Sequence, residues 1–162
     1  MTSGTKLLSP ASVPAPAWRT SRWFNHEGGL NNETLLGKVI VLHAFQMLCP
    51  GCVSHGLPQA QRIHETFDPE AVAVVGLHTV FEHHEAMRPV SLEAFLHEYR
   101  LTFPVGVDEA GEGTPIPKTM EAYEMRGTPT LILIDRQGYL RYRAFGQAPD
   151  LAVGAAIAQL MA

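Results

Sequence analysis

The sequence has no cluster of lysine or arginine: twelve basic residues stand against sixteen acidic ones, and the formal net charge is −4. Binding to nucleic acid through neutralised phosphates is therefore not expected. Long apolar runs are lacking too, because the longest, Val39 to Phe45, is far short of the ~20 residues that a membrane helix needs. An export signal is not evident, since Ser9 and Pro10 interrupt the first apolar residues. We therefore expect a cytoplasmic protein without a nucleic-acid or membrane partner.

Cysteine is scarce as well: there are two, and both lie in the tetrapeptide Cys49-Pro50-Gly51-Cys52. In a reducing cytoplasm, such a pair is not expected to be a structural disulfide. Hydrophobic residues make up 46% of the 162 residues, which suits one domain with one core. Several prolines interrupt the first 22 residues, which we expect to form an extended, weakly ordered arm before a domain at residues 23–162.

The pattern of apolar residues predicts an α/β fold. Short β-branched runs predict strands at residues 23–25, 39–45, 71–77, 103–108, 130–134 and 139–145. Apolar spacings of three and four predict helices at residues 54–67, 91–99, 116–125 and 150–161. This order implies a central mixed sheet with helices on both faces. Cys49 follows the first long strand, so we expect it at a strand-to-helix junction, at the N-terminus of a helix.

Two cysteines at the start of a helix favour thiol–disulfide chemistry. The unpaired N–H groups and the partial positive charge of a helix N-terminus stabilise a thiolate, which lowers the thiol pKa from ~8.5. Cys49, at the exposed end, is predicted to be the attacking nucleophile. Cys52, one turn later, is predicted to resolve the mixed disulfide that forms.

Two alternatives to this chemistry remain open. Both cysteines could be small buried hydrophobic residues. They could also bind zinc, but a single C-x-x-C supplies two of the four ligands required, so that His55, His83 or His84 would have to contribute.

The chain resembles the thioredoxin superfamily, and in particular its TlpA-like branch, the redoxins. Four segments in the family's order carry the resemblance, which covers about Trp23 to Ala162: residues 35–45, the Cys49–Cys52 tetrapeptide, residues 127–130 and residues 131–138. The resemblance implies a thioredoxin-like fold and a thiol–disulfide oxidoreductase. It also implies that Pro129 is cis and faces the disulfide, where the backbone at Thr128 receives the substrate. No cofactor is implied beyond the redox-active disulfide of Cys49 and Cys52, and no metal.

The chain departs from the family pattern at several positions. Leu48 replaces the tryptophan that usually precedes the first cysteine, and His43 stands where thioredoxin has a buried acid. His43 could therefore accept the proton of the resolving thiol, and His55, three residues after Cys52, is a second candidate for proton transfer. The alternative for both is a structural role, which is the commoner one for a lone histidine in an apolar strand. The helix proline, Pro58, comes one residue later than in the family, which predicts a local bulge in this helix.

The resemblance leaves other functions to be weighed. A peroxiredoxin-like thiol peroxidase with an antioxidant role could use Cys49, but such enzymes need Thr or Ser three residues earlier and Pro seven earlier, where this chain has Gln46 and Leu42. A metal-binding or redox-sensor module could use His78, His83 and His84, which lie in a segment inserted relative to minimal thioredoxin. The expected partners are disulfides or thiols of proteins or small molecules and an unidentified reductant, and the expected assembly is a monomer or a weak dimer.

Overall fold

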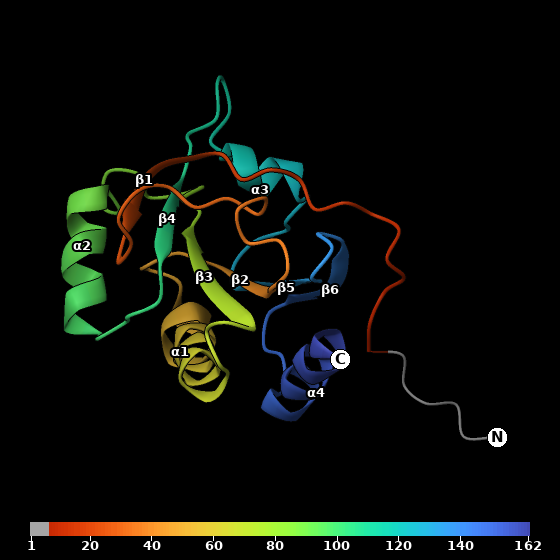
Figure 1. Ribbon diagram of the computed structural model, residues 1–162. Coiled ribbons are helices and arrows are strands. Elements are labelled where there is room, and N and C mark those ends of the chain that lie inside the picture. The colour runs from red at the N-terminus through yellow and green to blue at the C-terminus, as the bar shows by residue number, and fades with distance from the viewer. Residues whose placement is uncertain (1–6) are drawn as a thin grey trace.

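The computed structural model describes residues 7–162 and shows one six-stranded sheet flanked by helices (Figure 1). Its strands are β1 (Thr20–Phe24), β2 (Val39–Phe45), β3 (Val72–His78), β4 (Val105–Asp108), β5 (Thr130–Ile134) and β6 (Leu140–Phe145). Its helices are η1 (Cys52–Gly56, a π-helix), α1 (Leu57–Thr66), α2 (Pro89–Glu98), α3 (Lys118–Ala122) and α4 (Asp150–Met161). The thioredoxin-like α/β fold predicted from the sequence is confirmed.

The sheet is mixed, in the order β1-β4-β3-β2-β5-β6. β2 lies at its centre, parallel to β3 on one side and antiparallel to β5 on the other, and all seven of its residues are buried. β4 continues the parallel part, and β1 and β6 close the two edges as antiparallel strands. The carboxyl ends of β2, β3 and β4 therefore meet at one edge of the sheet, which is where Cys49 follows β2.

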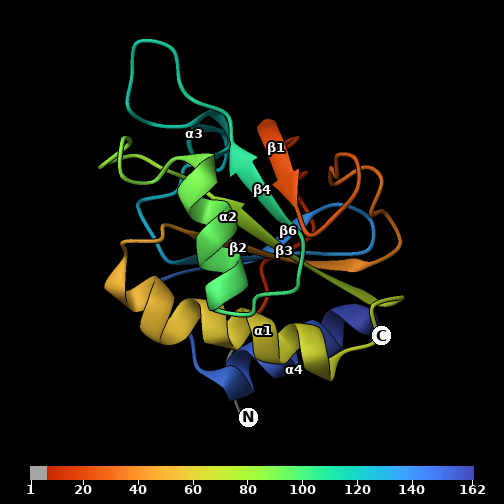
Figure 2. The same ribbon diagram turned by 90° about the vertical axis from the view of Figure 1, so that its left-hand side faces the viewer.

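Alternate residues of β2 supply the two hydrophobic cores. Val39, Val41 and Phe45 belong to the core that includes buried residues of α1, α2 and α4. Ile40, Leu42 and Ala44 belong to the other core, which includes α3 and Trp18. Two views at right angles show α1 and α4 together on one side of the sheet and α3 on the other, with α2 beside β1 and β4 (Figures 1 and 2). In the described part of the chain, none of the helices has the length and apolar character to cross a bilayer.

The segment before β1 is extended and runs along the sheet. The backbone N–H groups of Ser9 and Ala15 donate to the carbonyl oxygens of Arg141 and Gly138. Trp18 is buried, and β1 runs across the boundary that the sequence suggested between residues 22 and 23. Residues 7–19 thus cover part of the second core.

The helix after the cysteines contains the bulge that the position of Pro58 predicted. Helical structure begins at Pro50, takes the π form over Cys52–Gly56 and continues as α1. A π-turn accommodates one residue more than an α-turn, which matches the displacement of the proline by one position. Pro58 directly follows the π-turn, in the first turn of α1, so its missing N–H falls where the helical hydrogen-bond pattern changes.

Candidate redox site

Cys49 and Cys52 form a disulfide at the N-terminus of the helix that follows β2, with their Cα atoms 5.2 Å apart. Cys49 precedes the first helical residue, and its carbonyl oxygen accepts the N–H of Val53. The backbone N–H of Cys52 points to Sγ of Cys49 at 3.3 Å. Cys49 is half-buried, whereas Cys52 is fully buried. This asymmetry suits an outer sulfur that meets the substrate and an inner sulfur that resolves the product.

The loop before β5 lies directly against the disulfide. Sγ of Cys49 is 3.5 Å from the carbonyl oxygen of Thr128, 79 residues further along the chain. The Thr128–Pro129 peptide bond is cis, and a Cβ on Gly51 would lie 3.5 Å from Cδ of Pro129. The structure therefore brings Thr128 and Pro129 together with both cysteines. Thr128 is half-buried, so its backbone is reachable from the side of Cys49.

His43 lies in β2 beneath this loop. Its side chain is buried, and neither ring nitrogen has a hydrogen-bond partner. A Cβ on Gly56 would approach Nε2 of His43 to 2.7 Å and Cβ of Pro129 to 3.2 Å, so the π-turn packs against both the ring and the proline. Burial lowers the pKa of His43 to about 4, which leaves the ring neutral at pH 7. The neutral, unpaired imidazole thus keeps a free nitrogen lone pair under the active-site loop.

His55, in the π-turn, is half-buried, and its Nε2 is buried without a hydrogen-bond partner. Hydrogen bonds from Gln59 and Arg62 hold the pKa of Asp150 below its usual value, and the proximity of His55 lowers it slightly further. His55 therefore lies in the neighbourhood of Asp150, at the start of α4. Its neighbour Gly56 packs closely against both His43 and Pro129.

The histidines of the 78–84 segment do not come together. His78 is buried at the end of β3, whereas His83 and His84 are exposed and Nε2 of His84 lies 3.2 Å from the carbonyl oxygen of Pro115. Within residues 7–162, no three His, Cys, Asp or Glu side chains are grouped so as to hold a metal ion. The metal-binding interpretation of this segment therefore finds no support in the structure.

Gln46 and Leu42, which replace the expected peroxidase residues, have structural roles. Gln46 is buried, and its side-chain oxygen accepts the N–H of Phe81 at 3.1 Å. Leu42 belongs to the core on the α3 side of the sheet, whereas the cysteines are on the α1 side. Neither side chain is placed to bind a peroxide beside Cys49.

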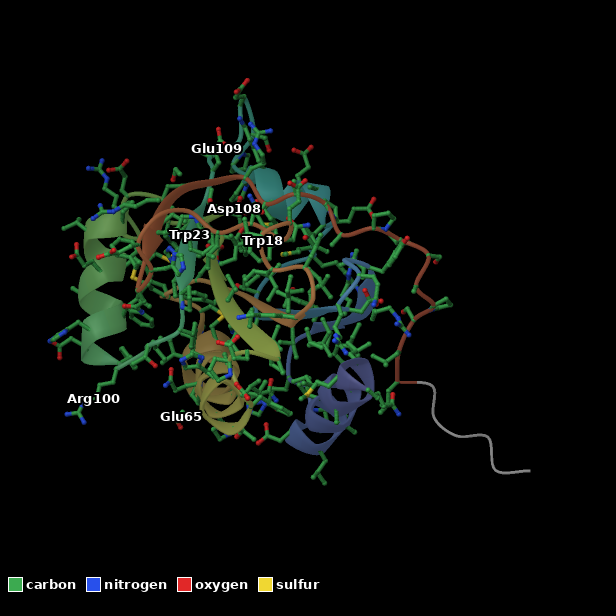
Figure 3. The ribbon with its side chains drawn as sticks, viewed as in Figure 1. Trp18, Trp23, Glu65, Arg100, Asp108 and Glu109 are labelled. Carbon is green, nitrogen blue, oxygen red and sulfur yellow. A yellow bond between two sulfur atoms is a disulfide. The ribbon has the colours of Figure 1, made fainter. Side chains whose placement is uncertain are left out.

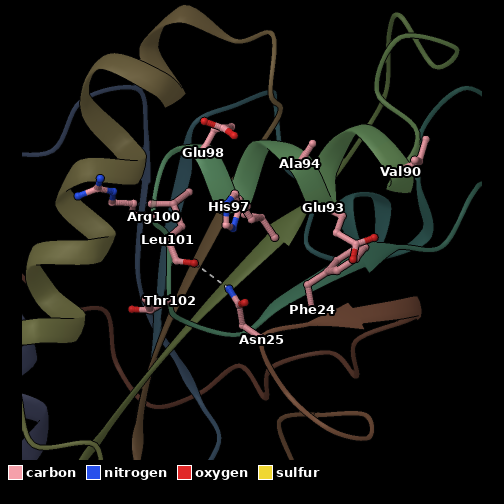
Figure 4. Close-up of a pocket in the computed structure, with 11 residues that line it drawn as sticks. Phe24, Asn25, Val90, Glu93, Ala94, His97, Glu98, Arg100, Leu101 and Thr102 are labelled. Atoms are coloured by element: carbon pink, nitrogen blue, oxygen red, sulfur yellow. Dashed lines mark hydrogen bonds between the residues drawn. The ribbon is translucent and has the colours of Figure 1, made fainter.

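A groove of about 1080 Å³ lies between α2 and the end of β1 (Figure 4). Its walls include Phe24 and His97, and Asn25 donates to the carbonyl oxygen of Leu101 across it. None of the residues around the disulfide lines it. The outer cysteine instead adjoins exposed surface, since Leu48 and Pro50 on either side of the half-buried Cys49 are exposed.

Sequence reasoning missed one contact of the turn that precedes Cys49. The backbone N–H of Met47 donates to Nε2 of His78 at 3.2 Å. The two residues are 31 positions apart, and only the parallel pairing of β2 with β3 brings them together. The one sign of this contact in the sequence was the position of His78, directly after the strand predicted at residues 71–77.

A model of the AhpC/TSA family matches residues 14–143. Among solved structures, a thioredoxin-like superfamily protein is 57% identical and superposes with a TM-score of 0.91 over 93% of this chain and 97% of its own. A thiol-disulfide isomerase from Corynebacterium glutamicum is 49% identical, with a TM-score of 0.89 over 93% of this chain and 97% of its own.

A curated relative also carries a redox name. The sporulation thiol-disulfide oxidoreductase A of Bacillus subtilis is 28% identical over 110 residues, which are 68% of this chain and 61% of that protein. The chain spans less than two thirds of the length of the curated relatives it matches, and as little as 16% of one of them.

Proposed function

The chain belongs to the AhpC/TSA family, and on that premise we propose that it is a thiol–disulfide oxidoreductase that works through Cys49 and Cys52. One observation carries the proposal: the two sulfurs form a disulfide at a helix N-terminus, with the outer sulfur accessible and the inner one buried. The names of the similar structure from Corynebacterium and of the Bacillus relative support the same chemistry.

The reaction consists of two exchanges. The Cys49 thiolate attacks one sulfur of a substrate disulfide, forming a mixed disulfide and releasing the other substrate sulfur as a thiolate that takes up a proton. Cys52 then loses its proton and attacks Sγ of Cys49, which forms the Cys49–Cys52 disulfide and releases the second substrate thiol. The substrate disulfide has gained two electrons and two protons, and the enzyme dithiol has lost them. The reverse sequence oxidises a dithiol.

The helix N-terminus activates the nucleophile. In the reduced protein, the N–H of Cys52 is placed to donate to the Cys49 thiolate, and the partial charge of the helix adds to this stabilisation. The Thr128 carbonyl, 3.5 Å from Sγ, is placed to accept the proton of the thiol form. The backbone at Thr128 and Pro129 would receive an extended substrate segment beside Cys49.

His43 is the proposed proton acceptor for Cys52. Leaving a buried imidazole without hydrogen bonds costs stability, so its presence under the active site favours a catalytic role over a structural one. His43→Leu should leave the melting temperature unchanged or raise it, because it removes two unpaired polar atoms. It should also slow resolution of a mixed disulfide at Cys49 by about a hundredfold, the usual size of general-base assistance.

Kinetics of the single steps test this assignment. Cys49 in the reduced protein is converted to a mixed disulfide with glutathione, and release of glutathione is followed by rapid mixing. Alkylation of Cys49 serves as the control, because His43→Leu should not change its rate. Release at the wild-type rate in His43→Leu would show that His43 is structural, and the same measurement on His55→Leu decides the role of the second histidine.

The overall proposal is tested by trapping. Cys52→Ala should accumulate stable mixed disulfides through Cys49 with protein partners, and Cys49→Ser should accumulate none. A Cys52→Ala protein that carries only a sulfenic acid at Cys49, and that consumes peroxide rapidly, would favour the peroxidase function instead.

The proposal also covers the direction of the redox reaction, the cellular compartment of the protein and its oligomeric state. In the cytoplasm, the compartment that the sequence predicts, the glutathione pool is reducing and the enzyme would act mainly as a reductant. Acid quenching of cells followed by alkylation would then find Cys49 and Cys52 mostly as thiols. Light scattering of the purified chain tests whether it is the proposed monomer or weak dimer.

A further inference from the structure

The turn that presents Cys49 is held from the neighbouring strand by a buried histidine. This turn closes on itself through the N–H of Cys49, which donates to the carbonyl oxygen of Gln46 at 3.2 Å. Within it, the N–H of Met47 donates to Nε2 of His78 at 3.2 Å. His78 is 1% exposed, so water cannot easily replace it as acceptor.

The hydrogen bond defines the state of the His78 ring. Because Nε2 accepts from a backbone N–H, it carries no proton, and the ring proton is on Nδ1. A protonated imidazolium would set one N–H against another. Burial keeps the ring neutral at pH 7, since it lowers the pKa of His78 to about 4.

The surroundings fix the ring in place. The Phe45 ring packs against it with centroids 5.1 Å apart, and the N–H of the next residue, Thr79, donates to the carbonyl oxygen of Phe45. The Thr79 hydroxyl donates to the buried carboxylate of Asp108 at 2.9 Å. Figure 3 shows Asp108 where β4 ends beside α3.

Asp108 extends this set of contacts toward the loop that carries the proline. Its carboxylate accepts the backbone N–H groups of Thr119 and Met120 at 2.8 and 3.0 Å, in the first turn of α3. The chain passes from α3 to Thr128 and Pro129 within a few residues. His78 thus holds the turn before Cys49, and the adjacent Thr79 is linked through Asp108 to α3.

We propose that His78 is a positioning residue for the nucleophile: through the Met47 N–H it holds the turn so that Sγ of Cys49 stays at the N–H of Cys52. The inference rests on the proposed function. Without this acceptor, the turn and Sγ move away from the helix N-terminus, and the thiolate loses part of its stabilisation. The Cys49 thiol then ionises less readily, and the dithiol protein becomes less stable relative to the disulfide.

Three variants separate positioning from bulk stability. His78→Leu removes the acceptor at similar volume. His78→Gln restores an acceptor, because the amide oxygen can reach the position of Nε2. Tyr123→Phe is the matched control, since it breaks a buried network on the other face of the sheet, where the Tyr123 hydroxyl accepts from Trp18 and donates to the Pro16 carbonyl.

Two readouts are measured on the full chain. One is the rate of alkylation of Cys49 by iodoacetamide at pH 7, and the other is the equilibrium of the protein dithiol and oxidised glutathione with the protein disulfide and two reduced glutathiones. His78→Leu should be alkylated about tenfold more slowly, which corresponds to ~1.4 kcal/mol. At a fixed glutathione ratio, its disulfide form should be favoured by a similar factor. His78→Gln should recover most of both values, and Tyr123→Phe should match the wild type in both.

Each result has a definite meaning. Wild-type values in His78→Leu would overturn the proposal, and so would equal defects in His78→Leu and His78→Gln or the same change in Tyr123→Phe. If the wild type itself fails to exchange with glutathione, the proposed function fails first. If His78→Leu does not fold, the imidazole ¹⁵N spectrum of the wild type decides: Nε2 should be unprotonated at pH 7, and a proton on Nε2 would overturn the assignment.

Discussion

Replacing Gly56 by alanine should destabilise this protein, although the same change stabilises most helices. The backbone at Gly56 is helical, with φ −64° and ψ −51°, so alanine fits it and intrinsic propensity favours alanine by ~1 kcal/mol. The added Cβ, however, would lie 2.5 Å from Cε1 of His43 and 3.2 Å from Cβ of Pro129. Neither neighbour is a flexible chain end, because the imidazole is buried in β2 and the proline belongs to the loop on the disulfide.

The expected size follows from these two opposing effects. Overpacking a buried site costs ~1–3 kcal/mol against the ~1 kcal/mol gain in propensity, so the free energy of unfolding should fall by up to ~2 kcal/mol. Because the displaced groups are His43 and Pro129, resolution of the mixed disulfide should slow as well.

Gly154 provides the matched control. It lies in α4, and a Cβ there would meet nothing within 4 Å, so Gly154→Ala should stabilise by ~0.5–1 kcal/mol. Urea unfolding of the oxidised proteins measures both effects, with equal m-values as the condition for comparing them. A Gly56→Ala protein as stable as Gly154→Ala would show that the close contact of the π-turn with His43 does not exist.

Three further predictions concern stability. Burial lowers the pKa of both His43 and His78 to about 4, below the 6.5 of an exposed ring, so the unfolded chain takes up these two protons first as the pH falls. The free energy of unfolding should therefore decrease between about pH 6.5 and pH 4, by up to ~3 kcal/mol for each ring. Urea midpoints that do not change over this pH range would contradict the prediction. Trp18→Ala should lower the free energy of unfolding by ~3–5 kcal/mol, because a buried indole is lost from the second core. Limited proteolysis should then cut the segment before β1. An unchanged melting temperature would show that this segment does not stabilise the domain. Gln59→Leu should cost ~1–3 kcal/mol, since it leaves the carbonyl oxygen of Ala148 without its 2.7 Å partner, and calorimetry that found no loss would refute this.

Much of the fold could be predicted because its strands are locally distinctive. The β2 and β5 runs are apolar on both faces, and the structure places them at 39–45 and 130–134 as expected. The predicted ends of helices and strands were less accurate where tertiary contacts determine them. The helix predicted at 116–125 is observed only at Lys118–Ala122, because Asp108 fixes its first turn from another strand. The edge strand β1 is longer than its apolar residues indicated, since pairing with β4 recruits the polar residues Thr20 to Arg22.

By itself, the sequence determined the chemistry and the local frame: two cysteines after a buried strand, at the start of a helix, and a proline displaced by one position. Short-range patterns suffice for these features, because burial and helix capping depend on neighbouring residues. Only the tertiary structure decided what surrounds the sulfurs. Thr128 reaches Cys49 across 79 residues and His78 reaches Met47 across 31, and both contacts follow from the order of strands in the sheet. Strand order depends on how the whole core closes, and no local pattern in the chain encodes it.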